Sequence, residues 1–367
     1  MRIGIVCYPT VGGSGVIATE MAMALAARGH ELHLLSYDRP GRLRGGIPGL
    51  RFHEVAVSAY PLFRYPPYDL ALATRMLEVR EEAKVDLFHV HYAIPHAVSA
   101  FLARSMCGGS LNFVTTLHGT DITVVGNDRS YMRPTRFALD QSDALTAVSR
   151  YLADETHLMF GVKQNVEVIY NFVDTERFRP SDSPPWHRRS DEERLLVHVS
   201  NFRPVKRVGD VVRAFAAIQR EIPARLLLLG DGPDREHALA VASDLGCSHR
   251  VEHLGMRDNL PEVLPQADLF LSASQTESFG LSILEAMSCG VPCISTDVGG
   301  VAEVVGDTGR LVPLGDTDAM ARAAVDLLSD ADRFDTIAAA ARQRAIEHFA
   351  TDRVVAQYEA LYQRVVD

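Results

Sequence analysis

Short runs of apolar residues alternate with longer segments of helical period through most of the chain. In the first half these runs predict strands over Ile3–Tyr8, Glu31–Ser36, Phe52–Val57, Leu87–His91, Phe113–Leu117, Ala144–Val148 and Val166–Ile169. A second series follows over Leu195–Ser200, Leu226–Leu229, Val251–Leu254, Leu269–Ser272, Cys293–Ser295 and Arg310–Val312. Strands that alternate with helices are typical of parallel sheets covered on both faces. The pattern therefore predicts an α/β protein with two such sheets.

The break between the two series indicates two domains. The chain has 367 residues, and a single core stops growing at roughly 250 to 300 residues. Residues 179–193 are rich in Pro, Ser and charge, which predicts a linker or an exposed excursion beside it. After Asp316 the pattern is helical, and apolar residues recur at helical spacing over Asp352–Val365. This last helix must pack its apolar side against another element.

Composition narrows the class of protein. Of all residues 47% are hydrophobic and 23% are charged, and no segment approaches the ~20 apolar residues of a membrane span. We therefore expect a soluble protein without stable membrane association. The first strand follows the initiator Met almost directly, without a signal-peptide pattern, which predicts a cytoplasmic location. The net charge of -10 argues against a nucleic-acid partner.

The five cysteines suggest neither a disulfide framework nor a metal site. They are odd in number and scattered, and between Cys289 and Cys293 the pattern predicts a helix end followed by a strand. We therefore predict no metal ligands in this chain.

A glycine-rich loop, Gly12-Gly13-Ser14-Gly15, joins the first strand to a helix predicted over Val16–Ala27. Such a loop lets a ligand approach the backbone, and the helix N-terminus attracts an anion. The same residues fit a dinucleotide fingerprint that ends at Ala18, with Asp38 after the next strand. A tight turn that needs glycine only for its backbone angles also fits. The loop alone leaves these three interpretations open.

Two loops of the second series carry charged pairs at the ends of predicted strands, where parallel sheets bind ligands. Arg203 and Lys206 have a spacing that suits a diphosphate, although a solvated basic turn has the same pattern. Glu277 lies in the next such loop, and Glu285 lies on a helix predicted over Leu281–Ser288. Separated carboxylates can accept hydroxyl hydrogens, as from a sugar and a ribose. An exposed Glu is usually only solvated, but burying a Glu inside an apolar helix is costly unless the carboxylate has a partner.

His118 follows the predicted strand Phe113–Leu117, within the sequence Leu117-His118-Gly119-Thr120-Asp121. It could act as a catalytic or orienting group, or it could be a satisfied polar residue beside a turn. Its position at the carboxyl end of a strand favours the functional role.

In combination and over the whole chain, these motifs resemble those of the retaining glycosyltransferases of family 4. Glu277 and Glu285 match the E-x7-E pattern of that family, and Gly12–Gly15 matches its N-terminal glycine loop. Arg203 and Lys206 match its diphosphate-binding pair. The resemblance implies the GT-B architecture, in which two Rossmann-like domains face each other. It implies an acceptor-binding domain over 1–172, a nucleotide-sugar-binding domain over 173–348, and a C-terminal helix over 349–367 that crosses back to the first domain.

Further stretches are similar to members of the family that use UDP-N-acetylglucosamine as donor and L-malate as acceptor, in the first step of bacillithiol biosynthesis. These stretches are Tyr8–Val16, Tyr60–Ala73, His89–Ala97, Thr115–Thr123 and Tyr170–Asp174. Other members use inositol phosphate or sugar phosphates, so a different small anionic acceptor stays an alternative.

The resemblance also implies roles for individual residues. The donor-binding residues that it implies are Gly13, Gly15, Asn171, Arg203, Lys206, Glu277, Phe279, Gly280, Leu281 and Glu285. The acceptor-binding residues that we expect are Ser14, Arg64, Tyr92, Thr120 and Arg136. Arg129 and Arg133 could share one helical stripe with Arg136, but they are not assigned to the acceptor. The implied catalytic residues are His118, Arg203, Lys206 and Glu277.

The resemblance further implies retention without a protein nucleophile, no required cofactor and no metal ion. A homo-oligomer stays open. Three other classes compete: an NAD-dependent Rossmann dehydrogenase, a sugar-nucleotide epimerase and a nucleotide-sugar sensor without catalysis. The dehydrogenase interpretation leaves Arg203, Lys206, Glu277 and Glu285 without a role.

Overall fold

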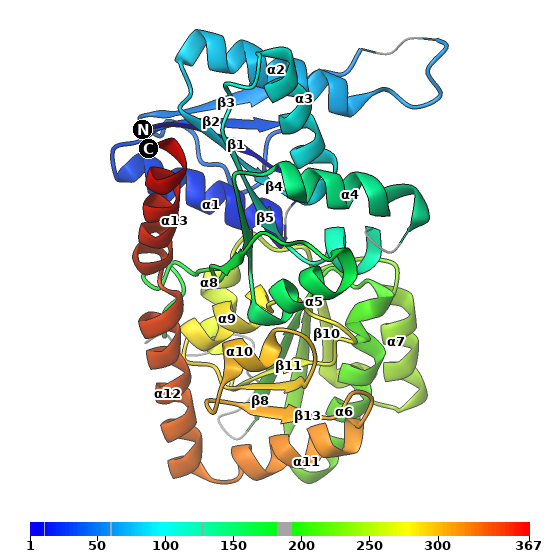
Figure 1. Cartoon of the computed structure of the whole chain (residues 1–367). Helices are drawn as coiled ribbons and strands as arrows, with labels where there is room; N and C mark the ends of the chain where they lie inside the picture. Colours follow the sequence, from blue (N-terminus) through cyan, green and yellow to red (C-terminus); the bar gives the residue numbers. More distant parts are fainter. Residues whose placement is uncertain (11, 59–60, 126–127, 182–192) are drawn as a thin grey trace. The chain divides into compact units, whose positions relative to one another are not determined.

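The computed structural model describes residues 1–10, 12–58, 61–125, 128–181 and 193–367 (Figure 1). It divides into two compact units. Unit 1 comprises Met1–Asn171 and Thr351–Asp367, and unit 2 comprises Phe172–Ala350. Unit 1 is therefore discontinuous in sequence, because its last helix follows the whole of unit 2.

Unit 1 is built on one parallel sheet with the strand order β3-β2-β1-β4-β5-β6-β7. The strands are β1 Arg2–Val6, β2 Glu31–Ser36, β3 Leu50–Glu54, β4 Leu87–His91, β5 Phe113–Leu117, β6 Ala144–Ala147 and β7 Val166–Val168. Its α-helices are α1 Ser14–Ala27, α2 Tyr68–Ala83, α3 Val98–Met106, α4 Arg129–Gln141, α5 Arg150–Phe160 and α13 Thr351–Val366. Figure 1 shows α2 and α3 on one face of this sheet and α1 and α13 on the other.

The central strands β4 and β5 of unit 1 have both of their faces covered, as is typical of parallel sheets. Every residue of β4 and β5 is buried. On the face covered by α2 and α3, Leu72, Met76, Phe88 and Phe113 belong to one hydrophobic cluster. This rigid centre holds the loops that leave the carboxyl ends of β1, β4 and β5.

The prediction of a strand over Phe52–Val57 is wrong in its bounds, since β3 covers Leu50–Glu54. β3 is an edge strand that pairs only with β2, and this pairing runs from Leu32 with Leu50 to Ser36 with Glu54. Because β2 ends at Ser36, the strand beside it must end there too. Half of an edge strand is exposed, so its apolar pattern is weak and does not mark its ends.

Unit 2 has a second parallel sheet with the strand order β10-β9-β8-β11-β12-β13. The strands are β8 Arg194–Val199, β9 Ala224–Leu229, β10 Val251–Gly255, β11 Leu269–Ser272, β12 Cys293–Thr296 and β13 Arg310–Val312. Its α-helices are α6 Val208–Glu221, α7 Arg235–Asp244, α8 Leu260–Val263, α9 Leu281–Ser288, α10 Val301–Val305, α11 Thr317–Leu328 and α12 Ala331–Phe349. The two sheets confirm the predicted α/β fold, and α9 has the predicted bounds.

The core of unit 2 forms where α6 and α11 pack on the sheet. Phe202, Val211, Phe215, Leu226 and Leu271 are fully buried members of one cluster. Phe202 directly precedes Arg203, so the core anchors the loop that carries the predicted phosphate-binding residues.

The predicted linker over 179–193 does not coincide with a boundary between the units. The chain passes from unit 1 to unit 2 after Asn171, and Phe178 is already buried in unit 2. Of the predicted segment, residues 182–192 lie outside the described residues.

The predicted C-terminal helix is α13, which belongs to unit 1. Its Tyr358 and Tyr362 are buried, and Tyr362 Oη lies 2.6 Å from Nδ1 of His89 on β4. This polar contact specifies where the helix docks. Among the described residues, no helix combines the length and the apolar character needed to cross a bilayer.

Candidate functional site

In each sheet the order of the strands reverses between two neighbouring strands, and the predicted site residues lie in the loops that follow these strands. In unit 1 the chain winds outward to either side of the adjacent strands β1 and β4, and in unit 2 it does so from β8 and β11. Loops after such neighbouring strands diverge and leave a crevice at the carboxyl end of the sheet, which is where open α/β sheets bind ligands.

In unit 1 two predicted acceptor-binding residues contact each other at this edge. The hydroxyl of Ser14, at the start of α1, donates a hydrogen bond to Tyr92 Oη at 3.1 Å. Tyr92 directly follows β4 and has a backbone φ of 87°. A non-glycine residue in that conformation is strained, and such strain concentrates at functional sites.

Gly15 is required because of close packing. The helix α1 begins at Ser14, two residues before the predicted start at Val16, so Gly15 lies in its first turn. A Cβ atom at Gly15 would lie 2.6 Å from the carbonyl oxygen of Tyr8 and 2.7 Å from that of Thr10. Any side chain would therefore displace the loop backbone. Gly13 is exposed, has a φ of +60° and would have nothing within 4 Å of a Cβ atom, so at this position glycine supplies only the backbone angle.

His118 follows β5 at the same edge, and its ring centroid lies 5.4 Å from that of Tyr92. Its loop is held by Asp121, whose carboxylate accepts hydrogen bonds from the backbone N–H groups of His118 and Gly119 at 3.2 and 2.9 Å. Burial raises the pKa of Asp121 from 3.8 to about 6. Thr120, between Gly119 and Asp121, is exposed. Ser14, Tyr92, His118 and Thr120 therefore all lie at the carboxyl edge of the sheet of unit 1.

Three buried histidines around His118 were not assigned a role from the sequence. Nδ1 of His91 lies 2.8 Å from Nε2 of His118, and the ring of His89 stacks on that of His91 with centroids 4.4 Å apart. His96 Nδ1 donates a hydrogen bond to the carbonyl oxygen of His91. Alternating histidines at the end of a predicted buried strand are the pattern that could have indicated this cluster.

In unit 2 the structure joins two predicted residues as an ion pair. Nζ of Lys206, after β8, lies 2.5 Å from Oε2 of Glu277, after β11, and both side chains are about one-fifth exposed. The hydroxyl of Ser274 donates to the same carboxylate oxygen at 3.4 Å. The two loops are also joined through the backbone, because Gln275 N–H donates to the carbonyl oxygen of Val205 at 2.7 Å.

The loop that carries Glu277 rests on a glycine that the sequence pattern alone does not indicate. A Cβ atom at Gly299 would lie 2.0 Å from the carbonyl oxygen of Glu277, and its φ is +57°. The N–H of Gly300 donates to that same oxygen at 2.9 Å. The glycine pair that follows β12 is therefore part of the support for Glu277.

The other predicted donor-binding residues differ in exposure. Arg203 is exposed at the start of the turn that contains Lys206. Glu285 is only 3% exposed, inside α9. Phe279 is buried against Phe349, so what it can offer a ligand is its backbone, together with that of Gly280 and Leu281 at the start of α9. Asn171 is buried at the end of the first segment of unit 1.

The predicted acceptor-binding arginines are exposed side chains on other elements of unit 1 than the Ser14–Tyr92 pair. Arg64 is exposed in the loop before α2, with its guanidinium 5.4 Å from the ring centre of Tyr65. Arg136 is exposed on α4, as are Arg129 and Arg133. These cations therefore face solvent.

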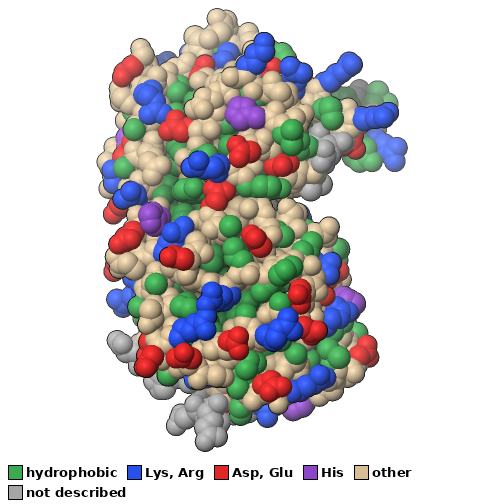
Figure 2. Space-filling model, turned by 60° about the horizontal axis from the view of Figure 1, so that its bottom comes forward, with side chains coloured by type: hydrophobic (Ala, Val, Ile, Leu, Met, Phe, Trp, Pro, Cys, Tyr) green, Lys and Arg blue, Asp and Glu red, His purple; other side chains and the backbone are tan. Residues whose placement is uncertain are grey.

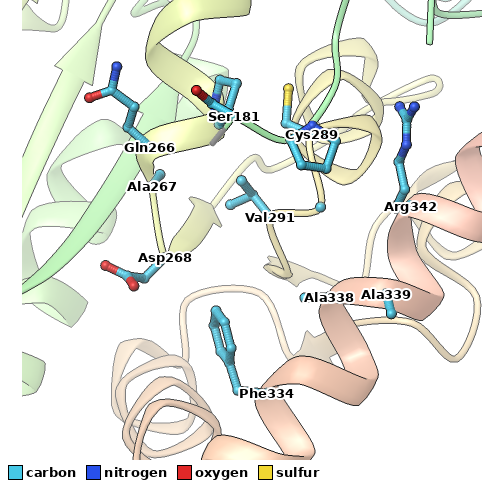
Figure 3. Close-up of a pocket in the computed structure, with 13 residues that line it drawn as sticks. Ser181, Gln266, Ala267, Asp268, Cys289, Val291, Phe334, Ala338, Ala339 and Arg342 are labelled. Atoms are coloured by element: carbon cyan, nitrogen blue, oxygen red, sulfur yellow. The ribbon is translucent and has the colours of Figure 1, made fainter. Parts of the chain in front are cut away.

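A pocket of about 470 Å³ lies elsewhere in unit 2 (Figure 3). Asp268 and Val291 line it and precede β11 and β12, so the pocket lies at the amino ends of these strands, opposite the Lys206–Glu277 pair. Arg342, on its rim, donates to the carbonyl oxygens of Phe178 and Ser288 at 2.8 and 2.6 Å. None of the predicted site residues lines this pocket.

Charge is mixed on the molecular face that Figure 2 shows, where cationic and anionic side chains are interspersed. That face presents no broad cationic surface of the kind that a nucleic-acid backbone requires. In the described part of the chain, no three His, Cys, Asp or Glu side chains are grouped as metal ligands.

Comparison with solved structures identifies the fold. The Anabaena protein HepE, in complex with UDP and glucose, matches with a TM-score of 0.84 and 20% identity, over 99% of both chains. Sucrose-phosphate synthase from Thermosynechococcus elongatus matches with a TM-score of 0.82 and 20% identity, over 99% of this chain and 98% of that one.

Comparison of sequences identifies the family. Residues 11–177 match the model of Glycosyltransferase Family 4, and residues 193–330 match that of Glycosyl transferases group 1. The N-acetyl-alpha-D-glucosaminyl L-malate synthase of Bacillus anthracis is 48% identical, over 100% of this chain and 97% of the relative. A D-inositol 3-phosphate glycosyltransferase of Salinispora tropica is 30% identical, over 97% of this chain and 81% of the relative.

These matches set the dehydrogenase interpretation of the glycine loop aside, since they cover both halves of the chain and account for the charged loops of unit 2. The predicted family, the two Rossmann-like parallel sheets and the transferase class are confirmed. The chain is a hexosyltransferase-type enzyme that belongs to glycosyltransferase family 4.

Proposed function

We propose that this enzyme transfers N-acetylglucosamine from UDP-N-acetylglucosamine to the hydroxyl group of L-malate, the first step of bacillithiol biosynthesis. One observation carries the proposal: the 48% identity to the Bacillus anthracis malate synthase extends over the full length of the chain. The inositol-phosphate relative, with a different acceptor, is only 30% identical.

On the donor side, the residues after β8 and β11 would bind the diphosphate and the sugar. Lys206 has three N–H donors, and only one is needed for Glu277, so the others can reach a phosphate oxygen. Glu277 uses Oε2 for Lys206 and Ser274, which leaves Oε1 to accept a sugar hydroxyl. Arg203 is exposed and can extend a second cation to the diphosphate.

On the acceptor side, Ser14, Tyr92 and Thr120 offer hydroxyl groups at the edge of unit 1. L-malate carries two carboxylates, so in a chain of net charge -10 its site must gather cations locally. Arg64 and Arg136 are the cations that we propose for this role. Because both are exposed in the structure, their effect should be smaller than that of a buried charge pair.

The reaction proposed is a displacement on one face of the sugar. The bond between the anomeric carbon and the β-phosphate oxygen breaks, and a bond to the malate hydroxyl oxygen forms on the same side. The malate proton passes to the departing phosphate oxygen, so no protein nucleophile, metal or cofactor is required. The protein stabilises the charge that develops on the diphosphate.

Product analysis tests the proposal. The purified protein is incubated with UDP-N-acetylglucosamine and L-malate in the presence of a chelator, and the products are analysed by mass spectrometry and NMR. We expect UDP and an α-linked N-acetylglucosaminyl malate in equal amounts. A β-linked product would contradict the retaining mechanism, and loss of activity with the chelator would contradict the absence of a metal.

Competition between acceptors tests separately whether L-malate is the acceptor. Inositol phosphate and glycerate are offered at the same concentration as malate. Glycerate lacks one carboxylate and should be a poor acceptor. If inositol phosphate is used in preference to malate, the acceptor is wrong while the glycosyltransferase assignment stands. UDP release that needs no acceptor would contradict both, and binding without turnover would indicate a sensor.

A further inference from the structure

The histidine that backs His118 has one ring nitrogen without a hydrogen-bond partner. His91 is fully buried at the end of β4, and its Nδ1 lies 2.8 Å from Nε2 of His118. The other nitrogen, Nε2 of His91, is buried and makes no hydrogen bond to any described residue. The two rings are nearly parallel, with centroids 5.0 Å apart and an interplanar angle of 25°.

The pair can share only one proton, because both rings are neutral near pH 7. Burial lowers the pKa of His118 to about 3 and the pKa of His91 well below its ordinary value of 6.5. Each neutral imidazole carries one N–H group and one lone pair. Therefore either Nδ1 of His91 donates to Nε2 of His118, or the bond runs in the opposite direction.

The unpartnered nitrogen decides between these two directions. If His118 donated to His91, the proton of His91 would lie on Nε2, as a buried N–H group with no acceptor among the described residues. Orphaned buried N–H groups are rare in folded proteins, whereas buried acceptors without a partner are somewhat less rare. A lone pair on Nε2 of His91, and a proton on Nδ1, is thus the favoured state.

The surroundings of His91 hold its ring in place. The ring of His89 stacks on it with centroids 4.4 Å apart. The backbone carbonyl of His91 accepts a hydrogen bond from His96 Nδ1, which fixes the end of β4. His91 is therefore rigid, while His118 is half-buried and its Nδ1 makes no hydrogen bond to the described residues.

We propose that His91 is a positioning residue, which donates its Nδ1 proton to Nε2 of His118 and so makes Nδ1 of His118 a hydrogen-bond donor to an oxygen of the bound substrate. The inference rests on the proposed transfer reaction. It has a chemical consequence: with Nε2 engaged and Nδ1 protonated, His118 has no free lone pair and cannot act as the base for the acceptor hydroxyl. This agrees with the reaction proposed above, in which the leaving phosphate oxygen takes that proton.

NMR of the full-length protein with isotope-labelled histidine tests the tautomer directly. In each imidazole the protonated nitrogen and the nitrogen with a lone pair differ widely in chemical shift. We expect His118 to carry its proton on Nδ1 in the wild type, and to lose this preference in His91→Leu. A proton on Nε2 of His118 in the wild type would overturn the inference, whatever the enzyme transfers.

Kinetics of matched variants test the role in catalysis. The amide nitrogen of Asn can take the place of Nδ1, whereas that of Gln takes the place of Nε2. We expect His91→Leu and His91→Gln to lower kcat about tenfold, the worth of one hydrogen bond, and His91→Asn to restore most of it. Thermal unfolding of each variant separates loss of folding from loss of the contact.

A double-mutant cycle separates positioning from general packing. If His91 acts through His118, His91→Leu should not lower kcat further in a His118→Ala background. An equal loss in both backgrounds would overturn the inference. If the wild type transfers nothing to malate, the proposed function fails, but the NMR measurement still decides the tautomer.

Discussion

Lys206 and Glu277 lie after different strands of unit 2, and their charges meet at 2.5 Å. The sequence indicates each residue separately, through its position after a predicted strand and through the resemblance to the family. It does not indicate their pairing, because that depends on how two loops far apart in sequence approach each other. Without ligand the two charges compensate, so the cation and the carboxylate are held in position before a substrate arrives.

Replacing Lys206 with Ala should lower kcat by ~100- to 1000-fold, because it removes a cation aimed at the charge of the transition state. Steady-state kinetics at saturating donor and acceptor measure the effect. Arg220→Ala is the matched control, since it removes an exposed cation from the distal end of α6. A kcat of Lys206→Ala close to that of Arg220→Ala would show that the diphosphate is bound elsewhere.

At the residue scale, sequence reasoning finds residues whose role depends on their place after a strand. Ser14, Tyr92 and His118 come together at one edge as a parallel sheet requires. It does not find residues whose role lies in support of another, such as His91 and Gly299. The contacts of these two residues join loops that follow different strands, and the order of residues along the chain does not show which loops lie close together.

At the scale of elements, apolar periodicity locates central strands and long helices well and edge strands poorly. β5 has its predicted bounds because it is buried along its whole length, with apolar residues at both of its ends. β3 is half-exposed and ends where its single neighbour ends. The ends of β3 are set by its pairing with β2, and the local sequence of β3 does not reveal that pairing.

The helix α13 is held in unit 1 by buried polar contacts as well as by apolar packing. Tyr362 Oη lies 2.6 Å from Nδ1 of His89 and 3.4 Å from the sulfur of Met21. His89 Nε2 in turn lies 2.6 Å from the hydroxyl of Thr116. This network joins α13 to the central strands β4 and β5.

Tyr362→Phe should therefore destabilise unit 1, since it leaves a buried nitrogen of His89 without a partner. We expect the free energy of unfolding to fall by about 1 to 3 kcal/mol, measured by chemical unfolding monitored through circular dichroism. Tyr131→Phe removes the same hydroxyl group from an exposed site on α4 and serves as the control. Equal effects of the two substitutions would show that the buried network contributes nothing to stability.

At the scale of the whole molecule, buried histidines are concentrated in one unit. In unit 1, burial lowers the pKa of His89 and His118 to about 3 and that of His96 to about 4. In unit 2, burial lowers the pKa of His198 to about 4. The units should therefore differ in their response to acid.

The direction in which stability changes with pH follows from proton binding. Below pH 6.5 these histidines become protonated in the unfolded chain but stay neutral in the folded one. Their contribution to stability is therefore complete above pH 6.5 and is lost as the pH falls toward 4 and 3. Asp121 acts in the opposite direction, since its pKa is raised to about 6 in the folded state. The burial of Asp69 also raises its pKa. The buried histidines of unit 1 outnumber these two carboxyl groups, and each unit of pKa shift is worth about 1.4 kcal/mol, so acid should weaken unit 1.

Hydrogen exchange detected by mass spectrometry, corrected for the intrinsic rate at each pH, measures this difference between about pH 7.5 and about pH 5. We expect protection to fall more in β4, β5 and α13 than in β8 and β11. Greater loss in unit 2 would contradict the assignment of these histidines as neutral, buried groups.

The discontinuity of unit 1 has a consequence for how the protein is made. Ribosomes synthesise chains from the N-terminus, so Phe172–Ala350 emerges after most of unit 1 and before Thr351–Asp367. Until then the part of unit 1 against which Tyr358 and Tyr362 are buried stays uncovered, while the continuous unit 2 already has all of its strands. Unit 1 can therefore acquire α13 only after the whole of unit 2 has been translated.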